Sequence, residues 1–199
     1  MSLGSLARKA RHYHRENGTQ ETLRMSRRYA SWRLQAVRFL LRNRGKMGKV
    51  GSALKIRGDI RLRASTEGTV TIGDNVELVG TLGRSTFFKV GGTLEIADEV
   101  FINRGCEIYA TTDVTLGYDA TLAPGIVIRD SDMHAVGGGT VQRDAVKIDP
   151  GAWIGTRSIV LKGVTVGQTA VLGACSGVTR DVPRDTVVAG SPAEVGREP

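Results

Sequence analysis

One histidine stands out among the residues that could do chemistry. His134 is the only histidine in the repetitive part of the chain, and it closely follows Asp130 and Asp132. A neutral imidazole can take the proton of a hydroxyl group while that oxygen attacks a carbonyl carbon. The glycines at 137–139 mark the surrounding segment as a loop, where catalytic groups are often found. An ordinary solvated loop histidine fits the same context, and the residues alone leave both interpretations open.

The other potential ligands and nucleophiles do not form a recognisable site. His12 and His14 lie near the N-terminus, so the repetitive part of the chain cannot supply a three-histidine zinc site. Cys106 and Cys175 are far apart in the sequence, which fits neither a disulfide framework nor a zinc-binding spacing. We therefore expect no metal and a reducing, cytoplasmic setting.

The elements that must position these residues are short and repeated. Every sixth residue is aliphatic over 148–178, and the same step runs over 54–108 with exceptions at Thr66 and Arg84. Neither the helical period of 3.6 nor the strand period of 2 sustains a six-residue step. It indicates a short strand and a turn, with three such units closing a triangular coil. The 26 glycines and the 5% aromatic content favour the same turn-rich, aliphatic architecture.

The repeat resembles that of the hexapeptide-repeat acyltransferases, a family that includes galactoside, maltose and xenobiotic O-acetyltransferases. The resemblance covers about residues 54–195. Its most specific motifs are Ala152-Trp153-Ile154-Gly155, the segments 163–167 and 172–174, Val178-Thr179-Arg180-Asp181-Val182-Pro183, and the segment 188–193. The resemblance implies an all-β solenoid, a left-handed parallel β-helix. The sequence adds an N-terminal α-helical arm and an excursion loop.

The family resemblance also implies an activity and an assembly. The chain would transfer an acetyl or related acyl group from acetyl-CoA to a hydroxyl, with His134 as the general base. Transfer in the family is direct, so neither Cys106 nor Cys175 needs a nucleophilic role. The family assembles as homotrimers with sites between subunits. A sugar in a polysaccharide, glycolipid or glycoside is the expected acceptor.

Individual binding residues follow from the resemblance. Asn103 and Asp132 are implied for the acceptor, although Asn103 also fits a turn residue with positive φ. Asp130 or Asp132 could orient His134 or simply be solvated in the loop. Trp153 could instead be a surface aromatic residue covered by another subunit. The residues implied for coenzyme A are Trp153, Gly155, Thr156, Ala174, Thr179, Arg180 and Arg197.

Two departures from the family pattern affect different parts of the expected site. Glu194 stands where relatives often have a second basic residue, so part of the expected contact to the phosphates of coenzyme A is missing. Thr111 and Thr112 stand where sugar-acetylating relatives have an aspartate. The acceptor is therefore not expected to be the same simple sugar. Two other functions remain open. One is acyl transfer to the amine of an amino sugar nucleotide, in which Asp132 could assist His134, and the other is a noncatalytic scaffold.

The chain is also divided by charge. Residues 1–50 form a basic arm of net charge +11, whereas 51–199 carry a net charge of −3. We expect the β-helix over 51–190, with its loop at 129–147, and a tail over 191–199. No apolar run approaches the roughly 18 residues of a membrane-spanning helix, and no secretory signal is visible at the N-terminus.

Residues 19–44 are expected to form an amphipathic helix. Its apolar stripe consists of Leu23, Ala30, Leu34, Val37 and Leu41. This helix could cover the open edge of the first coil, or it could attach to an anionic membrane through its arginines. Nucleic acid is not expected as a partner, because no base-reading motif accompanies the charge.

Overall fold

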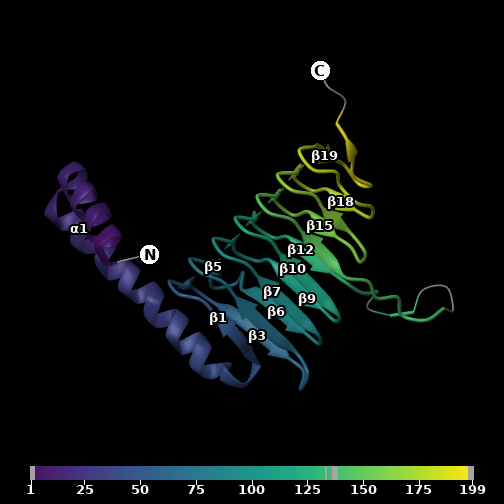
Figure 1. The fold of residues 1–199 in the computed structure, drawn as a ribbon, viewed down its shortest axis with the longest axis horizontal. Helices are drawn as coiled ribbons and strands as arrows, with labels where there is room; N and C mark the ends of the chain where they lie inside the picture. The colour runs from purple at the N-terminus through teal and green to yellow at the C-terminus, as the bar shows by residue number, and fades with distance from the viewer. Residues whose placement is uncertain (1–2, 133, 136–138, 197–199) are drawn as a thin grey trace.

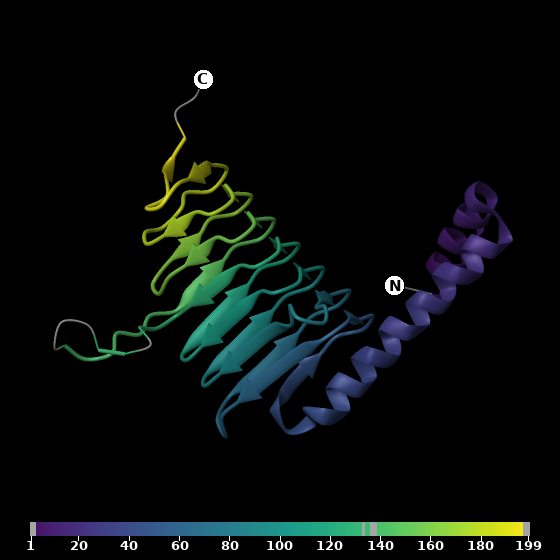
Figure 2. The ribbon, with the colours of Figure 1, turned by 180° about the vertical axis from the view of Figure 1, so that it is seen from behind.

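The computed structural model describes residues 3–132, 134–135 and 139–196. They form a left-handed parallel β-helix of about six turns, and a long helix, α1 (Leu3–Arg42), lies against its first coil (Figures 1 and 2). A single 3₁₀ turn, Arg44–Lys46, connects α1 to the first strand. The six-residue step therefore predicted the architecture correctly, because each step supplies one side of a triangular coil.

The strands stack into three faces of a prism. The first face contains β1 (Met47–Val50), β4 (Thr69–Ile72), β7 (Thr93–Ile96), β10 (Asp113–Leu116), β13 (Val146–Ile148) and β16 (Thr165–Val166). The second contains β2 (Lys55–Arg57), β5 (Glu77–Val79), β8 (Phe101–Ile102), β11 (Thr121–Leu122), β14 (Trp153–Ile154), β17 (Val171–Leu172), β19 (Val187–Ala189) and β20 (Glu194–Val195). The third contains β3 (Ile60–Ala64), β6 (Thr86–Val90), β9 (Glu107–Ala110), β12 (Val127–Arg129), β15 (Ile159–Val160) and β18 (Gly177–Val178).

The interior of the prism is an aliphatic column. Every aliphatic position of the six-residue repeat is buried, from Leu54 in the first coil to Val178 near the last. The small residues four positions further on, such as Ala152 and Ser158, are buried as well. The Ser158 hydroxyl donates a hydrogen bond of 2.9 Å to the carbonyl of Gly173 in the next coil, so this polar group is satisfied inside the stack.

Left-handed backbone conformations turn the chain at the corners. Asn75, Asp119 and Asp185 have φ between 55° and 58°, as expected for asparagine and aspartate at tight turns. Cys175 occupies such a corner with φ of 60°. Because β-strand pairing continues from one coil to the next, residues at equivalent corners lie above one another, roughly 4.8 Å apart.

The boundaries differ from those expected at four places. The β-helix begins with β1 at Met47 rather than at residue 51. Arg129 ends β12 and Val146 begins β13, so the excursion loop is residues 130–145 rather than 129–147. Part of the expected tail forms β20, which pairs antiparallel to β19. The helix begins at Leu3 rather than near residue 19. Within the described ranges, no helix has the length and apolar character needed to cross a bilayer.

The helix also packs with a different face from the one expected. Ala36 and Phe39 are buried against the first coil, and Trp32 stacks under the guanidinium of Arg57 at 5.0 Å. The Gln35 side chain accepts a 2.9 Å hydrogen bond from the backbone N–H of Gly58. The expected stripe, Leu23, Ala30, Leu34, Val37 and Leu41, is exposed instead. The helix does cover the edge of the first coil, but through a second apolar face.

Two leucines four positions apart allow a test of the interior column. Leu78 is fully buried, whereas Leu82 is fully exposed in the turn that follows. Leu78→Ala should lower the free energy of unfolding by about 2–5 kcal/mol, since it removes a buried side chain and leaves a cavity. Leu82→Ala should have almost no effect. Chemical denaturation of both variants measures the difference, and equal losses would contradict the placement of Leu78.

Candidate active site

Two corners of the prism carry the predicted site residues. We call the corner after the third-face strands, where the excursion loop leaves, the loop corner, and the corner after the second-face strands the tryptophan corner. Asp130, Asp132, His134, Thr179 and Arg180 lie at the loop corner. Asn103, Trp153, Gly155, Thr156 and Ala174 lie at or beside the tryptophan corner. The predicted base and the predicted cofactor residues around Trp153 are therefore on different corners of one chain.

Asp130 anchors the point where the loop leaves the β-helix. Its side chain is fully buried. Oδ1 accepts a 2.8 Å hydrogen bond from the N–H of Thr111, and Oδ2 accepts bonds of 2.6 and 2.9 Å from the N–H and hydroxyl of Thr112. Such multiple donors offset the cost of burying a carboxylate. Asp130 is neither solvated nor oriented toward His134, so both expectations for it are wrong.

The first and last residues of the loop are joined by backbone hydrogen bonds and form its neck. The N–H of Asp144 donates to the Asp130 carbonyl at 2.9 Å, and the N–H of Asp132 donates to the Gln142 carbonyl at the same distance. The following coil supports the neck from the other side, because the N–H of Gly163 donates to the Asp144 carbonyl at 3.1 Å. Both neighbouring coils therefore hold the base of the loop in place.

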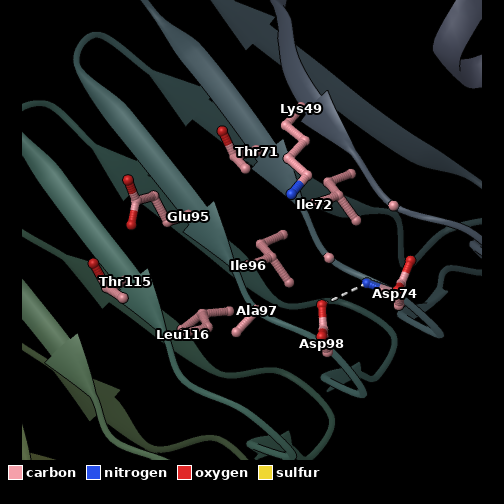
Figure 3. A pocket seen from close by; sticks show the side chains of 12 residues that line it. Lys49, Thr71, Ile72, Asp74, Glu95, Ile96, Ala97, Asp98, Thr115 and Leu116 are labelled. Atoms are coloured by element: carbon pink, nitrogen blue, oxygen red, sulfur yellow. Dashed lines mark hydrogen bonds between the residues drawn. The ribbon is translucent and has the colours of Figure 1, made fainter.

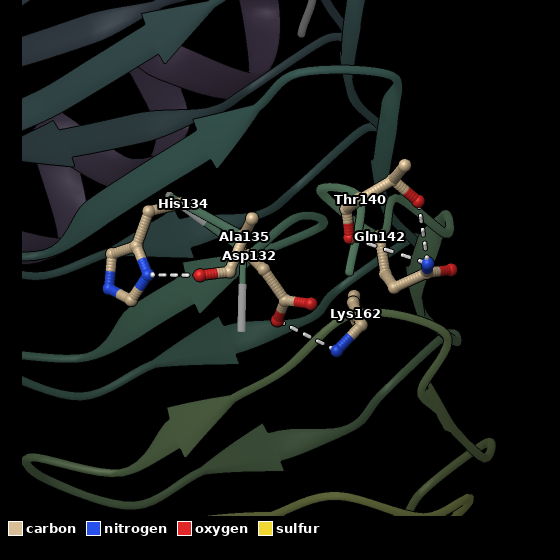
Figure 4. Close-up of polar contacts among 6 residues, drawn as sticks. All are labelled: Asp132, His134, Ala135, Thr140, Gln142 and Lys162. Carbon is tan, nitrogen blue, oxygen red and sulfur yellow. Dashed lines mark hydrogen bonds and ion pairs between the residues drawn. The ribbon is translucent and has the colours of Figure 1, made fainter. Parts of the chain in front are cut away.

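Asp132 is held by an ion pair and not by the histidine. Its Oδ1 accepts a hydrogen bond from the ammonium of Lys162 at 2.7 Å, and both side chains are largely screened from solvent. Figure 4 shows this pair and the His134 ring pointing in different directions. Lys162 lies at the loop corner of the next coil, so the ion pair fixes the loop further from its base.

The side chain of His134 is exposed, and its ring is oriented by a contact with the backbone of the next residue. Nδ1 lies 3.2 Å from the carbonyl oxygen of Ala135 (Figure 4). A carbonyl oxygen can only accept, so the neutral ring that makes this hydrogen bond carries its proton on Nδ1. The lone pair is then on Nε2, which leaves that atom able to accept a proton from a substrate.

The tryptophan corner has an exposed indole beside a strip of residues with short side chains, Gly155, Thr156 and Ala174. Trp153 is 57% exposed and pairs in register with Val171 of the next coil. A Cβ at Gly155 would collide with the Leu172 carbonyl, so only glycine fits there. The Thr156 carbonyl accepts a 2.8 Å hydrogen bond from the next coil, and Ala174 presents only a methyl group. A long, narrow ligand could lie along this strip.

Asn103 lies two coils before Trp153 at the same corner. Its Oδ1 accepts a 2.8 Å hydrogen bond from the N–H of Arg104. Gly105, with φ of 72°, takes the left-handed position of this turn, so Asn103 is not a positive-φ residue. The positive-φ explanation for this asparagine is therefore wrong, and its role in acceptor binding stays a prediction.

Sequence reasoning missed two arginines near Asn103. Arg84 packs over Gly105 and Arg157 over Gly125, and both line a depression of about 410 Å³ with Glu107. Each guanidinium group suits a carboxylate or phosphate ligand. The signal for Arg84 was present, because it interrupts the aliphatic step. Arg157 gave no comparable signal.

The structure says less about the roles of the remaining predicted residues. Thr179 and Arg180 are exposed at the loop corner, two coils beyond Asp130, and Glu194 is exposed in β20. Arg197 lies outside the described residues. Cys106 is not positioned as a nucleophile, and Cys175 is exposed at a corner of the prism. Cys106 is fully buried, and this burial raises the pKa of its thiol to about 11, which keeps it protonated at neutral pH.

Another depression lies away from these residues. It measures about 310 Å³ on the first face and is lined by Lys49, Thr71, Glu95 and their neighbours (Figure 3). The one hydrogen bond drawn there joins the Asp74 N–H to Asp98 at 2.7 Å. Its lining contains no histidine or cysteine, so it offers no base or nucleophile of that kind. Across the described part of the chain, no cluster of three or more His, Cys, Asp and Glu could hold a metal ion.

Curated proteins similar to this chain include several O-acetyltransferases. The chain is 29% identical to the galactoside O-acetyltransferase of Escherichia coli over 133 residues, which are 61% of this chain and 65% of that enzyme. It is 31% identical to the Lactococcus lactis enzyme of the same name over 54% of each chain. WbbJ of Escherichia coli, named for O-acetyl transfer in lipopolysaccharide biosynthesis, is 28% identical over 65% of this chain and 71% of its own. The chain thus spans less than two thirds of both galactoside enzymes. No family model matches it.

Solved structures share the fold. A variant of AntD, an N-acyltransferase from Bacillus cereus bound to dTDP-4-amino-4,6-dideoxyglucose and coenzyme A, has a TM-score of 0.68 and 19% identity over 80% of this chain and 88% of its own. The hexapeptide-repeat acetyltransferase VCA0836 of Vibrio cholerae, complexed with acetyl coenzyme A, has a TM-score of 0.55 and 21% identity over 89% and 88%. The resemblance to hexapeptide-repeat acyltransferases inferred from the repeat is confirmed.

Asp130 should matter for stability more than its position in a loop suggests. Asp130→Ala leaves the N–H groups of the half-buried Thr111 and Thr112 without acceptors, so it should lower the free energy of unfolding by about 3 kcal/mol. Asp181→Ala is the matched control, because Asp181 is exposed and accepts one backbone hydrogen bond, from Thr165. The decrease in the free energy of unfolding caused by Asp181→Ala should be much smaller. Comparable denaturation midpoints for the two variants would show that the buried anchor is unimportant.

Proposed function

We propose that the protein transfers an acetyl or related acyl group from coenzyme A to a hydroxyl of a saccharide. The observation that carries this proposal is the exposed imidazole of His134, whose Nδ1 faces a carbonyl while Nε2 is free to accept a proton. Its loop is held by Asp130 and by the Asp132–Lys162 ion pair. The similarity to O-acetyltransferases supports the same reaction.

The reaction needs one group that moves a proton. An alcohol is a weak nucleophile at neutral pH, so His134 Nε2 would take its proton as the oxygen attacks the thioester carbonyl. The C–O bond forms, the C–S bond breaks, and the imidazolium returns the proton to the departing thiolate. No acyl-enzyme is required, in keeping with a buried, protonated Cys106.

The tryptophan corner fits the narrow part of coenzyme A. Trp153 supplies an exposed aromatic surface, and the exposed Ala174 adds only a methyl group beside it. Gly155 keeps the two coils in contact at this point, because a Cβ there would meet the Leu172 carbonyl. Backbone groups at this corner are accessible to hydrogen bonding only where side chains are small. Thr156 would contact the same part of the ligand. Thr179, Arg180 and Arg197 stay proposed contacts to the nucleotide end, where a guanidinium suits phosphate.

We further propose that the site is complete only in a homotrimer. His134 and Trp153 lie on different corners of one prism, so a second copy must bring its tryptophan corner to the loop corner of the first. A closed three-fold ring makes this contact three times with one interface. Asn103, at the tryptophan corner, would then approach the histidine of its neighbour and bind the acceptor.

Oxygen transfer is favoured over transfer to an amine. The AntD structure shows that this fold serves an N-acyltransferase. In this chain, however, the carboxylate nearest in sequence to His134 is Asp132, and it is already paired with Lys162. It is therefore not free to bind an ammonium group. A noncatalytic scaffold would not explain why the loop that carries His134 is held by Asp130 and by the Asp132–Lys162 ion pair. Two free cysteines are compatible with a reducing, cytoplasmic compartment.

The role of His134 can be measured by thiol release. His134→Ala should reduce turnover with acetyl-CoA and a saccharide acceptor by about two orders of magnitude or more, because the general base is lost. Binding of coenzyme A, measured by calorimetry, should be retained. Cys175→Ser is the control and should leave turnover unchanged. Full turnover in His134→Ala would remove this residue from the mechanism.

Mixed oligomers test whether the site is shared. His134→Ala and Trp153→Ala should each be nearly inactive alone. When both are co-expressed, a site made from two subunits regains both wild-type residues in some arrangements, so about a quarter of wild-type activity should return. If one subunit supplied the whole site, mixing would restore nothing. Light scattering of the wild-type protein should give the mass of a trimer.

A further inference from the structure

We infer that the N-terminal helix docks the protein onto an anionic lipid surface through an apolar stripe bordered by arginines. This interaction surface is separate from the proposed acyl transfer and does not depend on it. The stripe consists of Leu23, Ala30, Leu34, Val37 and Leu41 on α1.

The stripe is exposed because the helix packs with its opposite side. At 100° per residue, Leu23, Leu34 and Leu41 fall on one line along the helix, about 180° from Trp32, Ala36 and Phe39. Ala36 and Phe39 are buried against the first coil. The four large stripe residues are instead 50–66% exposed. Exposed apolar residues aligned over about 27 Å of helix mark an interaction surface rather than scattered exposure.

The charges around the stripe determine which partner fits. Residues 20–44 contain seven arginines and one acidic residue, Glu21, which pairs with Arg24. Arg27 and Arg38 border the stripe and are exposed. Within residues 20–44, the positions that flank the stripe hold no carboxylate, so a second copy of this part of the helix would bring arginine toward arginine in a coiled-coil packing. Repulsion between copies therefore favours an anionic partner.

An anionic bilayer satisfies both features at once. Leucine and valine side chains enter the boundary between headgroups and acyl chains, while arginine stems lie along the apolar surface and their guanidinium groups reach phosphates. The helix would lie in the plane of the surface, between the lipid and the first coil. Figure 1 shows the coils stacked away from this end of the molecule, so the loop carrying His134 would stand off the surface.

Vesicle flotation tests the inference directly. The full-length protein should float with phosphatidylcholine vesicles that contain phosphatidylglycerol and not with phosphatidylcholine alone. Leu34→Ser/Leu41→Ser should weaken binding about 100-fold, because two apolar side chains no longer enter the lipid. Arg27→Gln/Arg38→Gln should weaken it about 25-fold, at about fivefold for each arginine.

Matched controls distinguish binding through this stripe from nonspecific binding of the protein to vesicles. Leu82→Ser/Tyr118→Ser changes two exposed apolar residues of the β-helix, and Arg63→Gln/Arg184→Gln changes two exposed arginines there. Both should bind vesicles like the wild type. All stripe residues are exposed, so unchanged circular dichroism and thiol release with a soluble acceptor should accompany the loss of binding.

Either of two outcomes would overturn the inference: the wild type fails to float with anionic vesicles, or the Leu34/Leu41 variant floats as well as the wild type. If the wild type does not float and the Leu34/Leu41 variant also has a lower oligomer mass, the stripe belongs to contacts between copies. Failure of thiol release in the wild type would instead count against the proposed acyl transfer alone.

Discussion

The hydrogen bonds between successive coils are the constraint on which the rest of the structure depends. Strands inside the stack pair in parallel with the strand one coil earlier and the strand one coil later, as Trp153 does with Thr121 and Val171. Inward residues are therefore small or aliphatic in nearly every coil, with Phe88 as an aromatic exception, because each coil encloses a similar triangular interior. Outward residues are free to vary, and function is confined to them and to the places where the chain leaves the stack.

The excursion loop shows how such a stack can carry a reactive group. Leaving the stack interrupts the backbone pairing at the loop corner, and the freed N–H groups of Thr111 and Thr112 need acceptors. Asp130 supplies them from the first residue of the loop. The same carboxylate thus satisfies the coil below and fixes the direction in which the loop departs. A loop tied in this way can present an exposed imidazole without unfolding the prism around it.

The periodic part of the structure was predictable from the sequence, and the irregular part was not. Each aliphatic residue of the six-residue step can be recognised from the sequence of its own coil alone. The buried interior could therefore be predicted from Leu54 to Val178. The burial of Asp130 depends on contacts with residues about twenty positions earlier, and no local pattern indicates it. Likewise, Arg84 could be seen as a break in the step, whereas the place of Arg157 beside it depends on how the coils stack.

The face through which the helix packs was predicted wrongly for a related physical reason. A helical stripe shows that one side is apolar, but it does not show what that side contacts. In α1, Phe39 is buried against the first coil and Trp32 makes a cation–π contact with Arg57, so the aromatic residues lie on the packed side. Packing at the open end of the prism therefore selects the aromatic side. The leucines are left facing outward beside the arginines, where burial inside this chain cannot account for them.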